Sequence, residues 1–457
     1  MIYSPHEEAI VAQCTPIGSG AIALLRLSGI NAYKIADKCT KLASKQLIST
    51  RTSHTVHYGW IVNEKGIHLD QVLFLVMHGP QTFTGQDIVE ITCHNNPFII
   101  DSIIQQLIRC GARIANRGEF TQRAYLNKKI DLVQAEAINE LIHAHTQQAL
   151  KKSLAQLEGS FSEWICNIEK KLLRALMLCE ASFEFNEDDI NFDDEIRTFI
   201  HSLLKDIQKI EQSYDQQQQI RDGIRIALIG SVNAGKSSLF NALIEKNRAI
   251  VTNIPGTTRD AIEAGMYTDS SYITLVDTAG LRNTDDHIEQ EGIKRSFEEA
   301  KKADIIILTI DSSNSPNAQE ETIYEKLISQ YSEKIIPVAT KSDIKQYNPT
   351  RKNLKFISTS TKAGKNIDLL KKEIQKKITK ILQTSEMPFL LNNRHFHTLQ
   401  KLKKDLQKIE SMTTKEIEPE LISIHLKDAL ERLTELSGKN ISEQALDEVF
   451  KQFCVGK

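Results

Sequence analysis

The sequence predicts a protein of mixed α/β and α class, in which an α/β unit with a mostly parallel sheet is inserted into a helical domain. Three observations support this prediction. Short apolar runs alternate with helical stretches between residues 224 and 343, a pattern that builds a parallel sheet with helices on both faces. The chain has helical periodicity on both sides of that segment. Its first 120 residues instead mix short β-like runs with turns, which predicts a separate α+β domain.

The composition is that of a globular chain without a general affinity for nucleic acid. A length of 457 residues corresponds to about three domains. The formal net charge of -2 provides no extended basic field, so any RNA contact must be local. Seven scattered cysteines without a CxxC pair argue against a disulfide framework or a zinc site and predict a cytoplasmic protein. No apolar run is long enough to cross a membrane.

The N-terminal domain, which we place at residues 1–120, contains two clear strand signals and one helix signal. Residues 21–29 and 71–80 are apolar runs that end at Gly or Pro, which predicts strands. Residues 97–112 predict a helix, because Pro97 suits its first turn and Gly111 suits its end.

Two helical segments follow, and we expect them to form one domain. In the first half, residues 121–218, apolar residues recur at spacings of three and four, and Asp131 with Gln134 predicts a capping box at a helix start. The second half, residues 380–457, contains three helical stretches. We expect the two halves to pack together, and an independent C-terminal domain is the alternative.

Two polar stretches flank the inserted unit, residues 219–379. The glutamine-rich stretch 212–223 predicts a linker. The Lys-rich stretch "LKKEIQKKITK" predicts a solvated helix face, with RNA contact as the less favoured alternative. Between these stretches, residues 224–230, 272–280, 303–311 and 334–343 predict buried strands.

A phosphate-binding motif follows the first of these strands. Gly230, Gly235, Lys236 and Ser237 have the spacing of a P-loop between a strand and an apolar helix. The main-chain N–H groups of such a loop surround phosphates, and the helix N-terminus adds positive potential. Lys236 can reach the β- and γ-phosphates, and Ser237 can bind Mg2+. A glycine-rich turn of a dinucleotide-binding fold is disfavoured, because Lys and Ser are both in register.

Further short motifs follow in the order typical of a GTPase. Thr258, next to Thr257, offers a hydroxyl to Mg2+, Asp277 can hold a metal-bound water, and Gly280 can donate its N–H to the γ-phosphate. Asp343 can accept two hydrogen bonds from guanine, which adenine cannot donate, so the motif favours GTP over ATP. In full, the residues predicted to bind GTP are Asn233, Ala234, Gly235, Lys236, Ser237, Ser238, Thr252, Asn253, Ile254, Pro255, Gly256, Thr257, Thr258, Asp277, Thr278, Ala279, Gly280, Thr340, Lys341, Asp343, Ser360, Thr361 and Lys362.

Two of these motifs depart from the usual pattern. Thr340 stands where the guanine motif usually has Asn, and its hydroxyl can replace part of the contacts of the amide. Thr361 replaces Ala in the segment that closes over the base, where the main-chain N–H is retained.

Across nearly its whole length the sequence resembles the bacterial tRNA modification GTPase family MnmE, also called TrmE. The resemblance rests on "IVAQCTPIGSGAIALLRLSG", "FTGQDIVE", "RGEFTQRAYLNKKIDLVQAEAI", "GSVNAGKSS", "IPGTTRD", "DTAGLR" and the final "FCVGK". It implies a Ras-like P-loop GTPase domain and an N-terminal domain that binds tetrahydrofolate and forms a homodimer. It also implies K+-dependent GTP hydrolysis and an FAD-binding partner, MnmG. With that partner, the family adds a 5-carboxymethylaminomethyl-type group to carbon 5 of the wobble uridine in certain tRNAs.

The resemblance assigns a second ligand and its residues. It implies that 5-formyltetrahydrofolate, or a related one-carbon tetrahydrofolate, is bound by Arg26, Glu90, Lys129 and Lys457. In "CHNNP", residues 93–97, two asparagines stand where the family typically has His-Gly-Gly. Cys454 is the near-terminal cysteine of the family, and either a chemical role or a small buried thiol remains open.

The residue that positions the attacking water is not evident from the GTPase motifs. Leu281 stands where Ras-type GTPases place a glutamine, and Asp285, Asp286, Glu289 and Glu291 are all candidates. The resemblance selects Glu289 as the catalytic residue. For the transition-state charge we expect a K+ ion rather than an arginine finger from Arg259 or Arg282. Its predicted ligands are Asn233, Thr252, Ile254 and Thr257.

A second function remains as an alternative, an RNA-binding GTPase of ribosome assembly without modification activity. Such a protein would carry a KH domain with a GXXG loop. The C-terminal region has no GXXG sequence.

Overall fold

The computed structural model contains two compact units, which we describe separately. The first unit comprises residues 1–139, 156–201 and 397–457, and the second comprises residues 140–155 and 202–396. The described residues are 8–181, 192–244, 262–268, 271–278, 288–344, 347, 349, 354–382, 387–413 and 419–457.

The first unit contains a seven-stranded sheet with the order β3-β4-β5-β6-β2-β1-β7. All neighbouring strands are antiparallel except β1 and β7, which are parallel. The predicted strands and helix of this region are confirmed, and Gly111 follows the helix with a φ of +116°. The strands are β1 (Ile10–Gln13), β2 (Ile22–Ser28), β3 (Thr40–Leu42), β4 (Thr55–Val62), β5 (His68–Met77), β6 (Ile88–His94) and β7 (Arg113–Ile114).

The alternation of side chains along β2 separates a core face from a polar face. Ala23, Leu25 and Leu27 are fully buried in a core shared with α1 (Ala32–Cys39) and α2 (Pro97–Arg109). Because successive side chains of a strand point to opposite faces, Arg26 lies on the other face of the sheet.

Helices that precede and follow the inserted unit pack against each other in the first unit. The capping box of α4 is confirmed, since the Gln134 N–H donates to Asp131 and the Asp131 N–H donates to Gln134. Helix α6 packs along α14, and Lys427 with Glu180 forms an ion pair between them at 2.9 Å. This contact is expected if the α/β unit is inserted into one helical domain. The helices with residues in this unit are α3 (Glu119–Leu126), α4 (Leu132–Ile142), α6 (Ser160–Ala181), α7 (Phe192–Gln212), α13 (Asn393–Thr413), α14 (Pro419–Ser437) and α15 (Glu443–Lys451).

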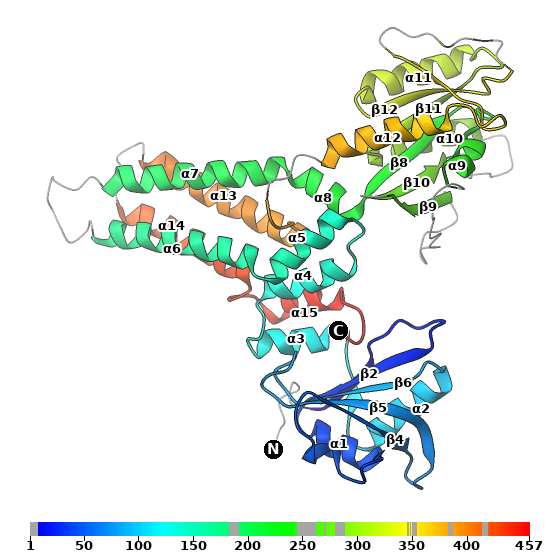
Figure 1. Ribbon diagram of the computed structural model, residues 1–457. Coiled ribbons are helices and arrows are strands. Elements are labelled where there is room, and N and C mark those ends of the chain that lie inside the picture. Colours follow the sequence, from blue (N-terminus) through cyan, green and yellow to red (C-terminus); the bar gives the residue numbers. More distant parts are fainter. Residues whose placement is uncertain are drawn as a thin grey trace. The chain divides into compact units, whose positions relative to one another are not determined.

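The second unit contains a six-stranded sheet with the order β13-β12-β11-β8-β10-β9. Figure 1 labels strands β8 to β12 of this sheet. Every neighbouring pair is parallel except β9 with β10, which confirms the mostly parallel sheet. One face packs on α9 and α12, and the other packs on α10 and α11. The elements are β8 (Ile224–Gly230), β9 (Ile262–Tyr267), β10 (Tyr272–Asp277), β11 (Ile305–Asp311), β12 (Ile335–Thr340), β13 (Ile357–Ser358), α9 (Lys236–Ile244), α10 (Ile288–Lys302), α11 (Ala318–Tyr331) and α12 (Ile367–Leu382).

The predicted linker at residues 212–223 is wrong, because most of this stretch forms helix α8 (Tyr214–Asp222). Glutamine is a good helix former, so a polar run of this composition does not by itself interrupt a helix. Tertiary contacts then hold the helix in the unit. Ile220 is buried, the Gln217 side chain accepts from the Leu391 N–H, and the Thr146 hydroxyl donates to the Ile220 carbonyl. None of the described helices has the length and apolarity that a membrane crossing requires.

Candidate functional site

The P-loop of the second unit lies between the end of β8 and the start of α9. Asn233 and Gly235 have φ values of +63° and +79°, so the loop turns sharply before the helix. Lys236 opens α9, and its ammonium donates to the carbonyls of Gly230 and Ser231 at 2.8 and 2.7 Å. The first N–H groups of a helix have no acceptor within that helix, so they are available to an anion at this end.

The charge of Lys236 makes this loop suitable for phosphate. Its side chain is buried, and burial lowers the pKa of the ammonium, while the nearby Asp277 carboxylate opposes that effect. Asp277 is itself buried at the end of β10. A buried cation is stabilised by an anionic partner, and the oxygens of a phosphate fit both the ammonium and the loop N–H groups.

The guanine motif and the base-closing segment lie next to each other. Asp343 is exposed, and the Ser360 hydroxyl donates to its carboxylate, which holds the pKa of Asp343 below its usual value. The Ser342 N–H donates to the Thr359 carbonyl at 3.0 Å, which joins the two segments through the main chain. The carboxylate therefore lies at the rim of the site, where it can accept hydrogen bonds from a base.

Thr340 connects the guanine motif to the P-loop. Its hydroxyl lies 2.7 Å from the Ala234 carbonyl and 3.2 Å from the Ile310 carbonyl, and the side chain is buried. The substitution of Thr for the usual Asn thus retains a direct link between the two loops.

Two further contacts at this site were not predicted from the sequence. The Lys341 ammonium lies 2.6 Å from the Asp311 carboxylate at the end of β11. The Tyr324 hydroxyl on α11 accepts from the Ser231 N–H at 3.0 Å. Neither Asp311 nor Tyr324 belongs to a recognisable motif, and only the parallel order of the strands could have suggested Asp311.

The structure describes some of the predicted GTP-binding residues but not others. Thr252, Asn253, Ile254, Pro255, Gly256, Thr257, Thr258, Ala279 and Gly280 lie outside the described residues. Glu289 lies in the first turn of α10, and its side chain also lies outside the described part. Of the four predicted K+ ligands, only Asn233 is described. These assignments therefore stay predictions.

In the first unit, Arg26 and Glu90 face each other across neighbouring strands. They are paired in the register of β2 with β6, and both Nε and Nη2 of Arg26 lie 2.8 Å from Oε1 of Glu90. The guanidinium also lies 5.7 Å from the Phe83 ring centroid and 5.5 Å from that of Phe120. Cation–π contacts of this kind hold the guanidinium in place without satisfying all of its donors.

Lys457 and Lys129 reach this region in different ways. The main-chain oxygen of Lys457 accepts from the Phe120 N–H at 3.2 Å, and Phe120 also contacts Arg26. The Lys129 ammonium donates to the Pro80 carbonyl at 2.9 Å and remains exposed. Phe120 thus contacts both Arg26 and the main chain of Lys457, whereas Lys129 contacts the loop that precedes Phe83.

The asparagines of "CHNNP" have structural roles of their own. The Asn95 amide donates to the Gly18 carbonyl at 2.8 Å, and the Asn96 side chain accepts from the Phe98 N–H at the start of α2. The register of Glu90 with Arg26 is retained beside them.

Cys454 is exposed, so the alternative of a small buried thiol is wrong.

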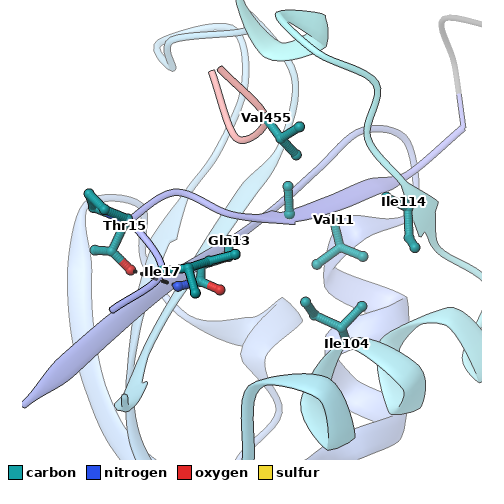
Figure 2. A pocket seen from close by; sticks show the side chains of 9 residues that line it. Val11, Gln13, Thr15, Ile17, Ile104, Ile114 and Val455 are labelled. Carbon is teal, nitrogen blue, oxygen red and sulfur yellow. Dashed lines mark hydrogen bonds between the residues drawn. The ribbon is translucent and has the colours of Figure 1, made fainter. Parts of the chain in front are cut away.

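An apolar pocket of about 300 Å³ lies near the end of β1 (Figure 2). Val11 and Ile114 line it together with Val455 from the C-terminal turn, and the Gln13 amide donates to the Thr15 hydroxyl at its edge. The lining contains none of the four residues predicted to bind folate. The pocket is therefore distinct from the charged cluster of Arg26 and Glu90.

Comparisons with known proteins cover nearly the whole chain. The family model described as MnmE helical domain matches residues 132–454, and the model described as GTP-binding protein TrmE N-terminus matches residues 9–129. The tRNA modification GTPase MnmE of Aquifex aeolicus is 37% identical over 98% of this chain and 100% of its own length. That of Chlorobium chlorochromatii is 34% identical over 99% of this chain and 98% of its own length.

A likeness to solved structures is weaker. The G domain of the T. maritima FeoB iron transporter aligns with 35% of this chain and 98% of its own length. The sequence identity is 25% and the TM-score is only 0.25. The family models cover both units, and the relatives match almost end to end. The chain therefore belongs to the MnmE family of tRNA modification GTPases.

Proposed function

We propose that this chain is the K+-dependent GTP-hydrolysing component of a complex that modifies carbon 5 of the wobble uridine in certain tRNAs. A one-carbon tetrahydrofolate supplies the added carbon, and the product carries a 5-carboxymethylaminomethyl-type group. The chain acts as a homodimer in the cytoplasm, with the FAD-binding protein MnmG as its partner. The observation that carries this proposal is the presence of two chemically different sites in one chain, a P-loop with a guanine motif and a charged cluster around Arg26.

The base-binding side of the first site supports GTP as the nucleotide. Asp343 accepts from Ser360 and stays ionised, because this hydrogen bond lowers its pKa. An ionised carboxylate can accept both the N1–H and the N2 amino group of guanine. Lys341 is fixed by Asp311, so its aliphatic part has a defined position beside the base.

The P-loop neutralises the phosphates of GTP through Lys236, its N–H groups and the start of α9. Mg2+ would be bound by Ser237 and Thr258. K+ would be held by Asn233, Thr252, Ile254 and Thr257, and it would supply positive charge to the negative charge that develops in the transition state. Glu289 orients the attacking water. With K+ bound, the segment 252–257 would contact a second GTPase domain, so activation would require two copies of the chain.

The second site has the chemistry that a reduced folate requires. Arg26 and Lys457 provide positive charge for carboxylates, and Glu90 can accept from donors of the pterin ring. Lys129 lies exposed at the neighbouring loop and adds a further cation. The aromatic rings of Phe83 and Phe120 beside Arg26 offer flat apolar surfaces.

The test of this function combines nucleoside analysis with GTP turnover. Total tRNA from a deletion strain should lack the modified wobble uridine, and the gene for this chain should restore it. In vitro, replacing K+ by Na+ at equal ionic strength should abolish most GTP turnover. The Glu289→Ala variant should bind GTP normally but hydrolyse it about 100-fold more slowly or worse.

A matched control and a contrary outcome are available. Glu298→Ala removes a carboxylate from the same helix, α10, and should leave turnover unchanged. A deletion strain with an unchanged wobble uridine profile would instead favour the ribosome-assembly GTPase. Equal turnover in both salts together with an active Glu289→Ala variant would redirect attention to Arg259 and Arg282.

A further inference from the structure

The C-terminal turn, residues 454–457, lies against the end of β1 and the start of α3. We propose that Gly456 and Cys14 are positioning residues that seat this turn, so that Lys457 is held beside Arg26 and Glu90. The inference rests on the proposed folate site, because it explains how one of its residues is placed. It assigns a role to two residues that have no part in the binding site itself.

Gly456 makes a contact that no other residue can make. Its φ is +94°, a conformation that residues with a side chain rarely adopt. A Cβ atom at this position would lie 2.3 Å from the Gln13 carbonyl oxygen and 2.9 Å from the Cα of Cys14. Both atoms belong to the main chain of β1 or its immediate continuation, so neither can move away cheaply. The turn can therefore approach β1 this closely only with glycine at position 456.

The side chain of Cys14 also contacts Gly456. Its sulfur lies 3.1 Å from the Gly456 carbonyl oxygen, which can only accept, so the thiol is the donor. Burial raises the pKa of Cys14, and the Glu90 carboxylate adds to this effect, while Arg26 and Lys457 oppose it. The thiol thus keeps its proton at neutral pH and acts as a donor rather than as a nucleophile.

Main-chain hydrogen bonds also hold both ends of the C-terminal turn in place. The Gly118 N–H donates to the Cys454 carbonyl at 3.4 Å, and the Phe120 N–H donates to the main-chain oxygen of Lys457 at 3.2 Å. The Cys14 N–H donates to the Leu24 carbonyl at 2.8 Å, which ties Cys14 to the strand that carries Arg26. A shift of the turn therefore moves Lys457 relative to the ion pair, while the helices that precede it can stay folded.

The test uses the full-length protein and two independent measurements. The first is the rate at which N-ethylmaleimide labels Cys14 and Cys454, read separately by peptide mass spectrometry. The second is the dissociation constant of 5-formyltetrahydrofolate. In the wild-type protein the exposed Cys454 should react fast and Cys14 slowly. Gly456→Ala should raise the labelling rate of Cys14 about tenfold and weaken folate binding by a similar factor.

The variants at Cys14 separate hydrogen bonding from packing. Cys14→Ser retains a donor and should bind folate as the wild type does, whereas Cys14→Ala should bind about fivefold more weakly, the effect of one lost hydrogen bond. Gly66→Ala is the matched control, because Gly66 has a φ of +72° but a Cβ added there would meet no atom within 4 Å. GTP turnover should stay unchanged in every variant, and circular dichroism verifies that each one is folded.

The outcomes distinguish this inference from the proposed function. Two results would overturn the inference that Gly456 and Cys14 position the C-terminal turn. One is a wild-type labelling rate of Cys14 in Gly456→Ala, and the other is an equal folate affinity of Cys14→Ala and Cys14→Ser. If the wild-type protein binds no folate, the proposed folate site is wrong. The labelling rate of Cys14 then tests the positioning role by itself. A higher rate in Gly456→Ala supports that role, and an unchanged rate overturns it.

Discussion

Replacing Thr340 by Val removes the hydroxyl that links the guanine motif to the P-loop while retaining the volume of the side chain. In the structure this hydroxyl lies 2.7 Å from the Ala234 carbonyl and 3.2 Å from the Ile310 carbonyl, and the residue is 4% exposed. A hydroxyl has one proton, so only the shorter contact is a full hydrogen bond. The variant therefore leaves the Ala234 carbonyl without this donor and with little access to water.

The cost of this change follows from the burial of the site. An unsatisfied buried acceptor costs about 1–3 kcal/mol, and here the acceptor belongs to the P-loop itself. If about 1–2 kcal/mol of this cost appears in the nucleotide-bound state, the affinity for GTP falls about 5- to 30-fold. Thr340→Ser keeps the donor and should bind GTP within about threefold of the wild type, the scale of a few tenths of a kcal/mol.

The assay is the dissociation constant of a fluorescent, non-hydrolysable GTP analogue, measured by stopped flow at fixed Mg2+ and K+ concentrations. Thr379→Val is the matched control, since its hydroxyl donates within α12 to the Gln375 carbonyl and touches neither loop. Equal affinities for Thr340→Val and the wild type would refute the reasoning, because they would show that the link between the two loops has no effect on nucleotide binding.

Three further predictions concern Asp343, Arg26 and Glu119. Asp343→Asn should weaken GTP and favour xanthosine triphosphate in competition binding, and an unchanged preference would show that Asp343 does not contact the base. Arg26→Ala should abolish uridine modification with GTP turnover intact, and a joint loss in a folded protein would contradict it. Burial would raise the pKa of Glu119, but hydrogen bonds from Arg113, the Asn116 N–H and Arg123 outweigh this and lower it. Glu119 thus contributes stability above its ordinary pKa of 4.5 that is lost as the pH falls through its folded-state pKa. Glu119→Gln should cost about 3–5 kcal/mol at pH 7 and remove this acid-dependent loss in urea melts, because it removes the carboxylate that forms an ion pair with the fully buried Arg123.

The proximity of the described GTPase motifs could be predicted from the sequence because these motifs lie at the ends of parallel strands. Strands β8, β10 and β12 all run in the same direction, so Gly230, Asp277 and Thr340 end at the same edge of the sheet. Once the alternation of strands and helices is recognised, the proximity of these residues follows from topology alone. The contact of Tyr324 with Ser231 does not, since it depends on the packing of a helix that has no motif.

The helix at residues 214–222 illustrates where composition misleads. Its sequence is almost entirely polar, a composition that predicts a linker. In the structure the single aliphatic residue, Ile220, is buried, and Gln217 uses its side chain to accept from the main chain at Leu391, a residue 174 positions away. Such long-range hydrogen bonds leave no periodic signal in the sequence.

The proposed folate site combines both situations, and this combination explains why only the resemblance to a family indicated it. Arg26 and Glu90 are cross-strand neighbours in an antiparallel pair, but they lie 64 positions apart with three other strands between them, so their register cannot be read from spacing. The C-terminal turn is farther still, since 442 positions separate Cys14 from Gly456. In the sequence, Arg26 and Glu90 each look like an ordinary surface charge, because they are paired only once the sheet is formed. The placement of Lys457 thus depends on tertiary packing, and glycine at position 456 is the one local feature that allows its final approach.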